Sequence, residues 1–321
     1  MTVIDSHLHV WDPSRAPYDW LGPALAPIDR AMGLADVRPE LRAAGVTGAV
    51  LVQAADHDAD TAHMLAVAAA HPEVVGVVAW VPLDDPGRAR TRLAELRRNP
   101  YVVGVRALVH ERPDPDWVLR PDVARGLDLL AGAGLPFDYV TSSPEALVHV
   151  PELAARHPGL RLVVDHLGKP PVGGGPAERA GWRELIGAAA RHPQVHAKVS
   201  GLYSATGPPG SWTTEQVRPF VEDALDLFGP GRLMYGGDWP VSVLAGGYAR
   251  GWAACLELLA PLSPADRAAV LGGTAATFYR IDPALLDAAR EAAGPPGEGA
   301  GRRGGGAAQR AHTVSRGTRE T

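Results

Sequence analysis

Short runs of β-branched residues recur along the whole chain, and each is followed by a stretch rich in Ala, Leu and Arg with helical spacing. This alternation is typical of repeated strand–helix units that build a parallel sheet. We expect strands at 2–10, 48–53, 76–83, 103–109, 135–140, 160–168, 195–202 and 232–241. Eight such units predict an α/β fold in which the sheet closes into a (β/α)₈ TIM barrel.

Three junctions between a helix and the next strand share one pattern, an Ala-rich helix followed by His, Pro and a strand: AAAHPEVVGVV, AARHPGLRLVV and AARHPQVHAKV. A His in the last helical turn faces the negative end of the helix dipole, and Pro stops the helix just beyond. We therefore interpret His71, His157 and His192 as helix terminators at the N-terminal, non-catalytic end of the barrel.

The end of the chain differs from the rest. From about Gly294 onward the sequence reads GPPGEGAGRRGGGAAQRAHTVSRGTRET, which has no apolar period. We predict one barrel domain at 1–290 and a disordered Gly/Arg-rich tail at 291–321, and His312 in this tail receives no role.

Composition excludes several classes of protein. With 46% hydrophobic and 21% charged residues, the chain has enough apolar material for a full core. A net charge of -5 and the lack of a basic cluster before the tail argue against nucleic-acid binding. The opening MTVIDSHLHVWD is unlike a secretory signal, and no apolar run is long enough to span a membrane. The single cysteine, Cys255, fits a reducing cytoplasm, and its apolar helical setting predicts a buried structural thiol.

Two histidines stand at the end of the first predicted strand. His7 and His9 flank Leu8, so the two-residue period of a strand places both imidazoles on one face. Such a pair can hold a metal ion or grip an oxyanion, although two core histidines would give the same pattern. The position of DSHLH at the start of an apparent barrel favours the functional interpretation.

Two further candidates lie at strand ends. His166, in VVDHLGKPP, and Asp238, in MYGGDWPV, each follow a buried run and precede a loop. In a TIM barrel these loops form the catalytic face. A carboxylate near imidazoles is suited to general-base duty or metal ligation, and simple capping of a strand end is the structural alternative.

Lysine is rare in this chain. Of 31 basic residues only Lys169 and Lys198 are lysines, and both fall at catalytic ends of strands. If His196, Lys198 and Ser200 share one face, Lys198 points into the barrel mouth, where it could bind a substrate oxygen; a surface lysine is the alternative. Arg106 is placed similarly, and an inward Arg needs an anion or a polar ligand as its partner.

Tryptophans gather in the predicted loops, at Trp11, Trp20, Trp117, Trp212 and Trp239. Aromatic rings can stack on the C–H faces of sugars or simply plug the ends of loops. We take Trp11, Trp20 and Trp239 as candidates for substrate contact.

Several motifs together carry a family resemblance. They are IDSHLHVWDP with YDWL, Gly104 to Arg106, Phe137–Asp138, Asp165–His166 with Lys169–Pro170, Lys198 to Leu202, and Gly236 to Pro240. With these motifs in order, the chain resembles the amidohydrolase superfamily, and more narrowly the amidohydrolase-related group that includes L-fuconolactonase, L-rhamnonolactonase and 2-pyrone-4,6-dicarboxylate lactonase. The similarity runs from Asp5 to about Tyr279.

The resemblance implies a reaction and roles. It implies hydrolysis of a small-molecule lactone, here a sugar lactone of the L-fuconolactone or L-rhamnonolactone type, to the aldonic acid. Asp238 matches the residue that activates water. The charge on the carbonyl oxygen would be stabilised by His7, His9, His166 and Arg106, with Lys198 as a further candidate.

Two departures from the family pattern bear on cofactor and substrate. The fifth run ends in FDYVTSS, without the His or modified Lys of many metal-dependent members, which argues against a binuclear site. The options are no required cofactor, as related lactonases are thought to work, or a single divalent ion such as zinc on His7, His9 and Asp238. Ala107 stands where sugar lactonases of this group often have a His, so the identity of the sugar substrate stays open.

Three alternatives remain. One is a metal-dependent non-oxidative decarboxylase on the same barrel. Another is a 2-pyrone-4,6-dicarboxylate-type lactonase, which would call on Arg106, Arg112 and Arg15. The last is a catalytically silent barrel used for binding, against which the histidines and Asp238 stand. The sequence does not choose between a monomer and a homodimer.

Overall fold

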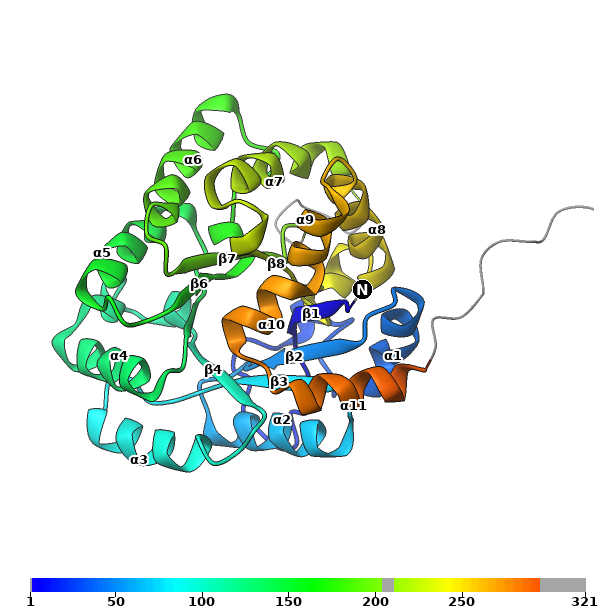
Figure 1. Ribbon diagram of the computed structural model, residues 1–321. Coiled ribbons are helices and arrows are strands. Elements are labelled where there is room, and N and C mark those ends of the chain that lie inside the picture. The colour runs from blue at the N-terminus through cyan, green and yellow to red at the C-terminus, as the bar shows by residue number, and fades with distance from the viewer. Residues whose placement is uncertain (1, 204–210, 295–321) are drawn as a thin grey trace, which may run out of the picture.

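The predicted barrel is present (Figure 1). A computed structural model describes residues 2–203 and 211–294. All neighbouring strands are parallel and follow chain order, and they are β1 (Ile4–Leu8), β2 (Gly48–Val52), β3 (Val74–Ala79), β4 (Val102–Ala107), β5 (Phe137–Tyr139), β6 (Leu162–Val164), β7 (Val195–Val199) and β8 (Leu233–Tyr235). The eight strand predictions are confirmed, although several predicted runs continue past the strand into the loop that follows it.

The seam between β8 and β1 is closed by a short contact rather than a full ladder. Leu8 and Trp239 form a parallel bridge, and the His9 N–H donates to the Trp239 carbonyl over 2.7 Å. The Asp238 N–H donates to the His7 carbonyl over 2.8 Å. The barrel is therefore nearly closed, and its seam joins the first and last strands next to His7 and Asp238.

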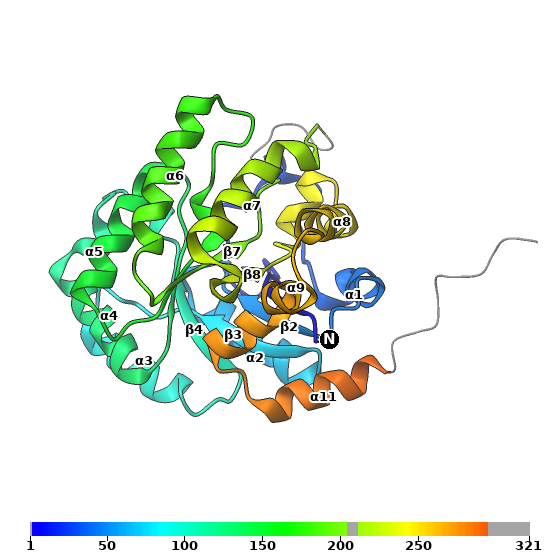
Figure 2. The ribbon, with the colours of Figure 1, turned by 45° about the horizontal axis from the view of Figure 1, so that its top comes forward.

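A ring of helices surrounds the strands (Figures 1 and 2). One helix follows each strand in turn: α1 (Leu34–Ala43), α2 (Asp58–Ala70), α3 (Pro86–Leu96), α4 (Pro121–Ala133), α5 (His149–Arg156), α6 (Pro176–Ala190), α7 (Thr214–Phe228) and α8 (Tyr248–Leu259). The chain ends with α9 (Pro264–Ala268), α10 (Thr274–Tyr279) and α11 (Pro283–Ala293). The predicted tail lies outside the described residues except for 291–294, of which 291–293 complete α11.

Local sequence signals explain where helices begin and end. Pro121 opens α4, and Gly134 ends it in the left-handed conformation, as is usual for a helix stop. His71 and His157 cap the C-termini of α2 and α5, as predicted. His192 lies one residue beyond Arg191, which caps α6.

Alternate residues of the strands pack on opposite sides of the sheet. In β2, Leu51 faces the surrounding helices, whereas Val50 and Val52 belong to an apolar cluster with the last helices. That cluster includes Phe278 and Tyr279 of α10, which are almost fully buried. The last helices therefore close one end of the barrel with apolar side chains and leave the other end for polar groups.

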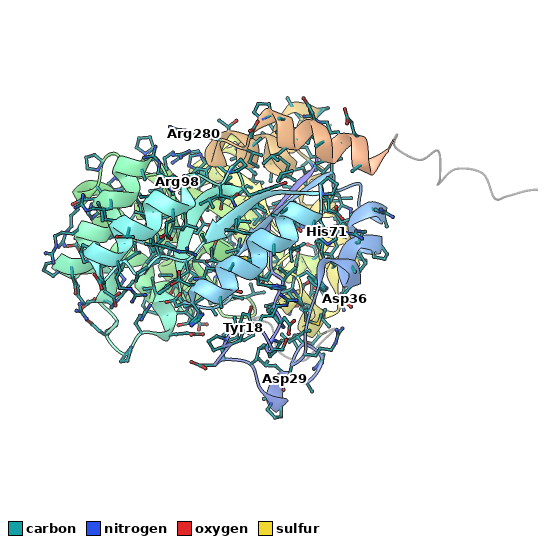
Figure 3. All side chains as sticks on the ribbon, turned by 90° about the horizontal axis from the view of Figure 1, so that it is seen from below. Tyr18, Asp29, Asp36, His71, Arg98 and Arg280 are labelled. Carbon is teal, nitrogen blue, oxygen red and sulfur yellow. The ribbon has the colours of Figure 1, made fainter. Side chains whose placement is uncertain are left out.

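The two ends of the barrel are separated in Figure 3. Arg98 and Arg280 lie at the end covered by α11, and Tyr18 and Asp29, from the loop after β1, lie at the opposite end. None of the described helices is long and apolar enough to cross a membrane. The single cysteine, Cys255, is buried in α8, as predicted, and burial raises the pKa of its thiol to about 12.

Candidate active site

The two histidines of β1 meet at the floor of the open end. His7 is fully buried and His9 is 4% exposed, and their Nε2 atoms lie 3.1 Å apart. His9 Nδ1 lies 2.7 Å from the Val52 carbonyl, which can only accept, so this nitrogen carries a proton. The prediction that both imidazoles share one face is confirmed.

Asp238 reaches the same point from the other side of the seam. Its Oδ1 lies 3.5 Å from His9 Nε2 and 3.7 Å from His7 Nε2. The preceding glycine, Gly237, donates its N–H to Asp5 over 3.0 Å, and a Cβ there would lie 2.2 Å from the Tyr248 ring, so only glycine fits.

The charge state of Asp238 follows from its neighbours. Burial raises the pKa of this carboxyl group, but the adjacent His166 and His9 lower it more, so its pKa lies below the ordinary value. Asp238 is therefore an ionised carboxylate at neutral pH, almost completely buried yet in contact with the cavity.

His166 projects from an unusual left-handed turn. His166, Leu167, Gly168 and Lys169 all have positive φ angles, between 50° and 69°. Such a conformation costs roughly 1–2 kcal/mol for each residue that has a Cβ, so the surroundings must hold it. The indole of Trp182 does so by donating to the Leu167 carbonyl over 2.8 Å.

This turn aims two side chains at the cavity. His166 and Lys169 both line it, and His166 Nδ1 lies 2.9 Å from the Ser200 hydroxyl. Burial lowers the pKa of His166 to about 3, so its imidazole is neutral at neutral pH. With Ser200 on Nδ1, the other ring nitrogen is left for the cavity.

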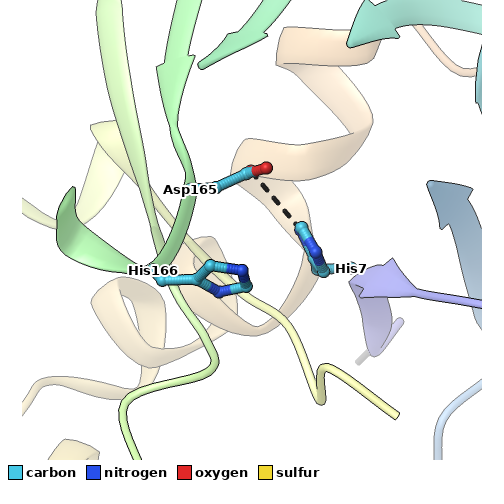
Figure 4. A group of neighbouring side chains, drawn as sticks. All are labelled: His7, Asp165 and His166. Carbon is cyan, nitrogen blue, oxygen red and sulfur yellow. Dashed lines mark ion pairs between the residues drawn. The ribbon is translucent and has the colours of Figure 1, made fainter. Parts of the chain in front are cut away.

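A cluster of buried charges lies beneath the histidines. Asp165 pairs with Arg106 over 3.0 Å and lies 3.4 Å from His7, as Figure 4 shows for the histidine contact. Lys198 is fully buried and contacts Asp138 over 2.6 Å and Asp165 over 3.0 Å. Burial alone would raise the pKa of Asp165, but Lys198 and His7 lower it to well below its ordinary value.

Above this floor lies a cavity of 530 Å³, large enough for a small sugar derivative. Its lining is mainly apolar and aromatic on one side and polar on the other. The residues that line it are His9, Trp11, Trp20, Leu25, Ile28, Ala54, Arg106, Leu108, His110, Glu111, Val140, Thr141, Ser142, His166, Lys169, Asp238, Val241 and Leu244.

The cavity separates the predicted substrate-binding residues into two groups. Trp11, Trp20, Arg106 and Lys169 line it, so for these four contact with substrate stays a prediction. Lys198 points into the barrel but is not among the described residues that line the cavity, and its contact with substrate stays a prediction.

The other tryptophans also have structural surroundings. Trp239 is 2% exposed, is absent from the described lining and belongs to the seam, and its contact with substrate stays a prediction. Trp117 is buried and donates to Asp84, and Trp212 stacks on Tyr203 with 3.9 Å between ring centroids. For Trp117, Trp212 and Trp239 the structure agrees with the plugging role that tryptophans also serve in loops.

The atoms of His7, His9 and Asp238 fit a single zinc ion. Their separations of 3.1, 3.5 and 3.7 Å are close to the roughly 3.3–3.6 Å between ligands of tetrahedral zinc with bonds of about 2.0–2.2 Å. The hydrogen bond from His9 Nδ1 to a carbonyl orients that ring as zinc-bound histidines are usually oriented. Three ligands with a cavity on the open side match the pattern of catalytic zinc sites.

Residues 4–281 match the amidohydrolase family, Amidohydro_2. The chain belongs to this family. A protein from Burkholderia ambifaria named L-fucono-1,5-lactonase is 37% identical to this amidohydrolase over 283 residues, covering 87% of this chain and 96% of its own length. A protein of the same name from Burkholderia multivorans is 33% identical over 287 residues, with the same coverage of both chains.

A solved structure agrees with the family assignment. A crystal structure of an amidohydrolase from Burkholderia multivorans with bound zinc superimposes on this amidohydrolase with a TM-score of 0.82. The two sequences are 31% identical, and the match covers 88% of this chain and all of the other.

Several site residues of this amidohydrolase were not among the sequence-based candidates: Gln53, His110, Asp138, Asp165 and Ser200. Asp138 and Asp165 belong to the motifs that carried the resemblance. Asp165 directly follows β6, and this position at a strand end was a signal that could have identified it, whereas Asp138 lies within β5. Their roles depend on pairing with Lys198 across the barrel, which no local pattern encodes.

Proposed function

We propose that this protein hydrolyses a sugar lactone, of the L-fuconolactone or L-rhamnonolactone type, to the aldonic acid. Action on a lactone ester makes it a hydrolase, as are the two relatives named L-fucono-1,5-lactonase. The observation that carries the proposal is the ionised Asp238 on the cavity floor, within 3.7 Å of two imidazole nitrogens.

In the proposed reaction Asp238 takes a proton from a water molecule in the cavity. The water oxygen forms a bond to the lactone carbonyl carbon, and the carbonyl oxygen gains negative charge. When this intermediate collapses, the bond between that carbon and the ring oxygen breaks. The ring oxygen receives the proton that Asp238 holds and becomes a hydroxyl group, so that lactone and water together give the hydroxy acid.

The charge on the carbonyl oxygen would be stabilised by donors already aimed at the cavity. Arg106 is 4% exposed, and its Nε has no hydrogen-bond partner among the described residues, although Asp165 and the Gln53 carbonyl accept from its two terminal nitrogens. The neutral His166, with Ser200 on Nδ1, can present an Nε2–H donor to the cavity. Donors fixed before the reaction contribute most in such a buried site.

The remaining walls suit a small polyol with one apolar face. Trp11 and Trp20 stand edge to face with ring centroids 5.1 Å apart, and both indole N–H groups donate to backbone carbonyls. Their rings are therefore fixed and can pack against C–H groups of a sugar. Thr141, Ser142 and Lys169 line the polar side, where hydroxyl groups of the substrate would lie.

If zinc is part of the active protein, His7, His9 and Asp238 would hold it. The ion would supply Lewis acidity toward the carbonyl oxygen. The roles proposed here for Arg106, His166 and the cavity walls apply equally with or without the ion.

The test is hydrolysis of a panel of aldonolactones and 2-pyrone-4,6-dicarboxylate, followed with a pH indicator in the presence and absence of a chelator. We expect acid release from an aldonolactone, and a loss of about 10²–10⁴-fold in kcat for Asp238→Asn because the general base is removed. Asp29→Asn, an exposed carboxylate at the same end of the barrel, is the matched control. Silence on every lactone would overturn the proposal and favour a metal-dependent decarboxylase.

A further inference from the structure

The ammonium group of Lys198 is placed as a bound cation would be. It is fully buried, and Nζ lies 2.6 Å from Asp138 Oδ2, 3.0 Å from Asp165 Oδ1 and 3.0 Å from His7 Nδ1. An ammonium group has three N–H donors, and here each of them has an acceptor. A hydrogen bond from Tyr279 to Asp138 over 2.6 Å fixes the far side of the cluster.

The same region contains a second set of metal-type ligands. Besides His7, His9 and Asp238, the atoms of His7, Asp165 and His166 lie close enough together to hold a metal ion. Figure 4 shows these three side chains converging from β1 and from the turn after β6. Lys198 contacts two of them, His7 and Asp165, from below.

We propose that the Lys198 ammonium is a resident cation that fills the deeper of two cation positions in the barrel, the one formed by Asp138, Asp165 and His7 Nδ1, and so keeps a metal ion out of it. It is a positioning residue that acts through the two carboxylates. The proposal concerns the charges of the site and holds whatever lactone the protein hydrolyses.

The contacts of Lys198 place a cation next to the second ligand set. Its Nζ lies 3.0 Å from two members of that set, His7 Nδ1 and Asp165 Oδ1, and 2.6 Å from Asp138 Oδ2. On the other side of the imidazole, His7 Nε2 lies 3.1 Å from His9 Nε2 and 3.4 Å from Arg106 Nη1. A cation therefore already stands where a metal ion bound to His7 Nδ1 and Asp165 would lie.

The balance of charge gives the same result. Arg106 neutralises part of Asp165, but Asp138 has only Lys198 as a cationic partner among the described residues, and its Oδ1 has no hydrogen bond there. Two buried carboxylates without this ammonium group would be costly. They would recruit another cation, and their oxygens together with His7 Nδ1 are suitable ligands for a divalent metal.

The first test counts zinc ions. Purified Lys198→Met is stripped with a chelator, loaded with zinc and desalted, and its metal content is measured by mass spectrometry. We expect at least one equivalent more than in the wild type. The double variant Lys198→Met/Asp138→Asn loses the cation and one carboxylate together, and it should return to the zinc content of the wild type. Lys169→Met, which removes the other lysine, should also keep the zinc content of the wild type. Equal zinc in Lys198→Met and the wild type overturns the proposal, and so does extra zinc in either control.

A second test needs no change at Lys198 and therefore does not depend on how that variant folds. His9→Gln removes a ligand of the upper position only, because His9 belongs to the set with His7 and Asp238 and not to the set with Asp165. Loaded with zinc and desalted in the same way, this variant should hold no zinc, since Lys198 occupies the deeper position. One equivalent of zinc in His9→Gln would contradict the proposal.

Discussion

Gly201 offers a sharp test of how closely His166 and Asp238 are packed. This glycine follows Ser200 at the end of β7 and has φ +58°, in the left-handed region. A Cβ at this position would lie 2.4 Å from His166 Nδ1 and 2.6 Å from Asp238 Oδ2, whereas ordinary contacts begin at 3.4 Å. The methyl group of Gly201→Ala must therefore displace His166 and Asp238 by close to the difference between these distances and 3.4 Å.

The expected size of the effect follows from that displacement. A displacement of roughly 1 Å in an active site costs on the order of 10²-fold in rate. The left-handed backbone costs an alanine about 1–2 kcal/mol, and overpacking adds about 1–3 kcal/mol. We expect Gly201→Ala to lower kcat/KM by about 100-fold and the free energy of unfolding by about 2–5 kcal/mol.

The assay compares initial rates on the best lactone with urea unfolding curves. Gly45→Ala is the matched control, because Gly45 has φ +70° but nothing within 4 Å of a new Cβ. That variant should lose about 1–2 kcal/mol of stability and keep its full rate. If Gly201→Ala retains kcat/KM within about threefold of the Gly45→Ala control, the inferred packing of His166 against Asp238 is wrong.

Two further predictions concern pH and the left-handed turn. The proposed hydrolysis needs an ionised Asp238 and a neutral His166. The pKa of each group is lowered, to about 3 for His166, so both active forms persist on acidification. We expect kcat/KM to be level from about pH 5 to 8, and a tenfold fall by pH 5 in buffers of constant ionic strength would contradict this. Trp182→Phe removes the hydrogen bond that holds the Leu167 carbonyl and should cost about 1–3 kcal/mol in urea unfolding. It should also lower kcat, whereas Trp117→Phe, whose indole contacts Asp84 away from the cavity, should lower stability alone.

The barrel could be predicted because its signal is repeated and local. Most strands show a short β-branched run, several helices are rich in Ala, and His71 and His157 mark helix ends, so an error in one unit does not spread to the next. The same logic located His7, His9, His166 and Asp238, since the ends of parallel strands lie on one face.

The sequence alone did not predict how deep each inward-facing side chain lies within the barrel. Lys198 points inward as expected, but its ion pairs with two buried carboxylates from other strands could not be predicted. Likewise, four successive positive φ angles from His166 to Lys169 are not expected of residues other than glycine. They exist because Trp182, from the next helix, holds the turn from outside.

The seam between β8 and β1 has a consequence for synthesis of the chain. Asp5 and Gly237, which join across it, are 232 positions apart. A ribosome therefore releases His7 and His9 long before it has made Asp238, and the nascent chain lacks part of the proposed site for most of translation. The proposed activity needs the last strand docked against the first, so its appearance during refolding or cell-free synthesis should report the closure of the barrel itself.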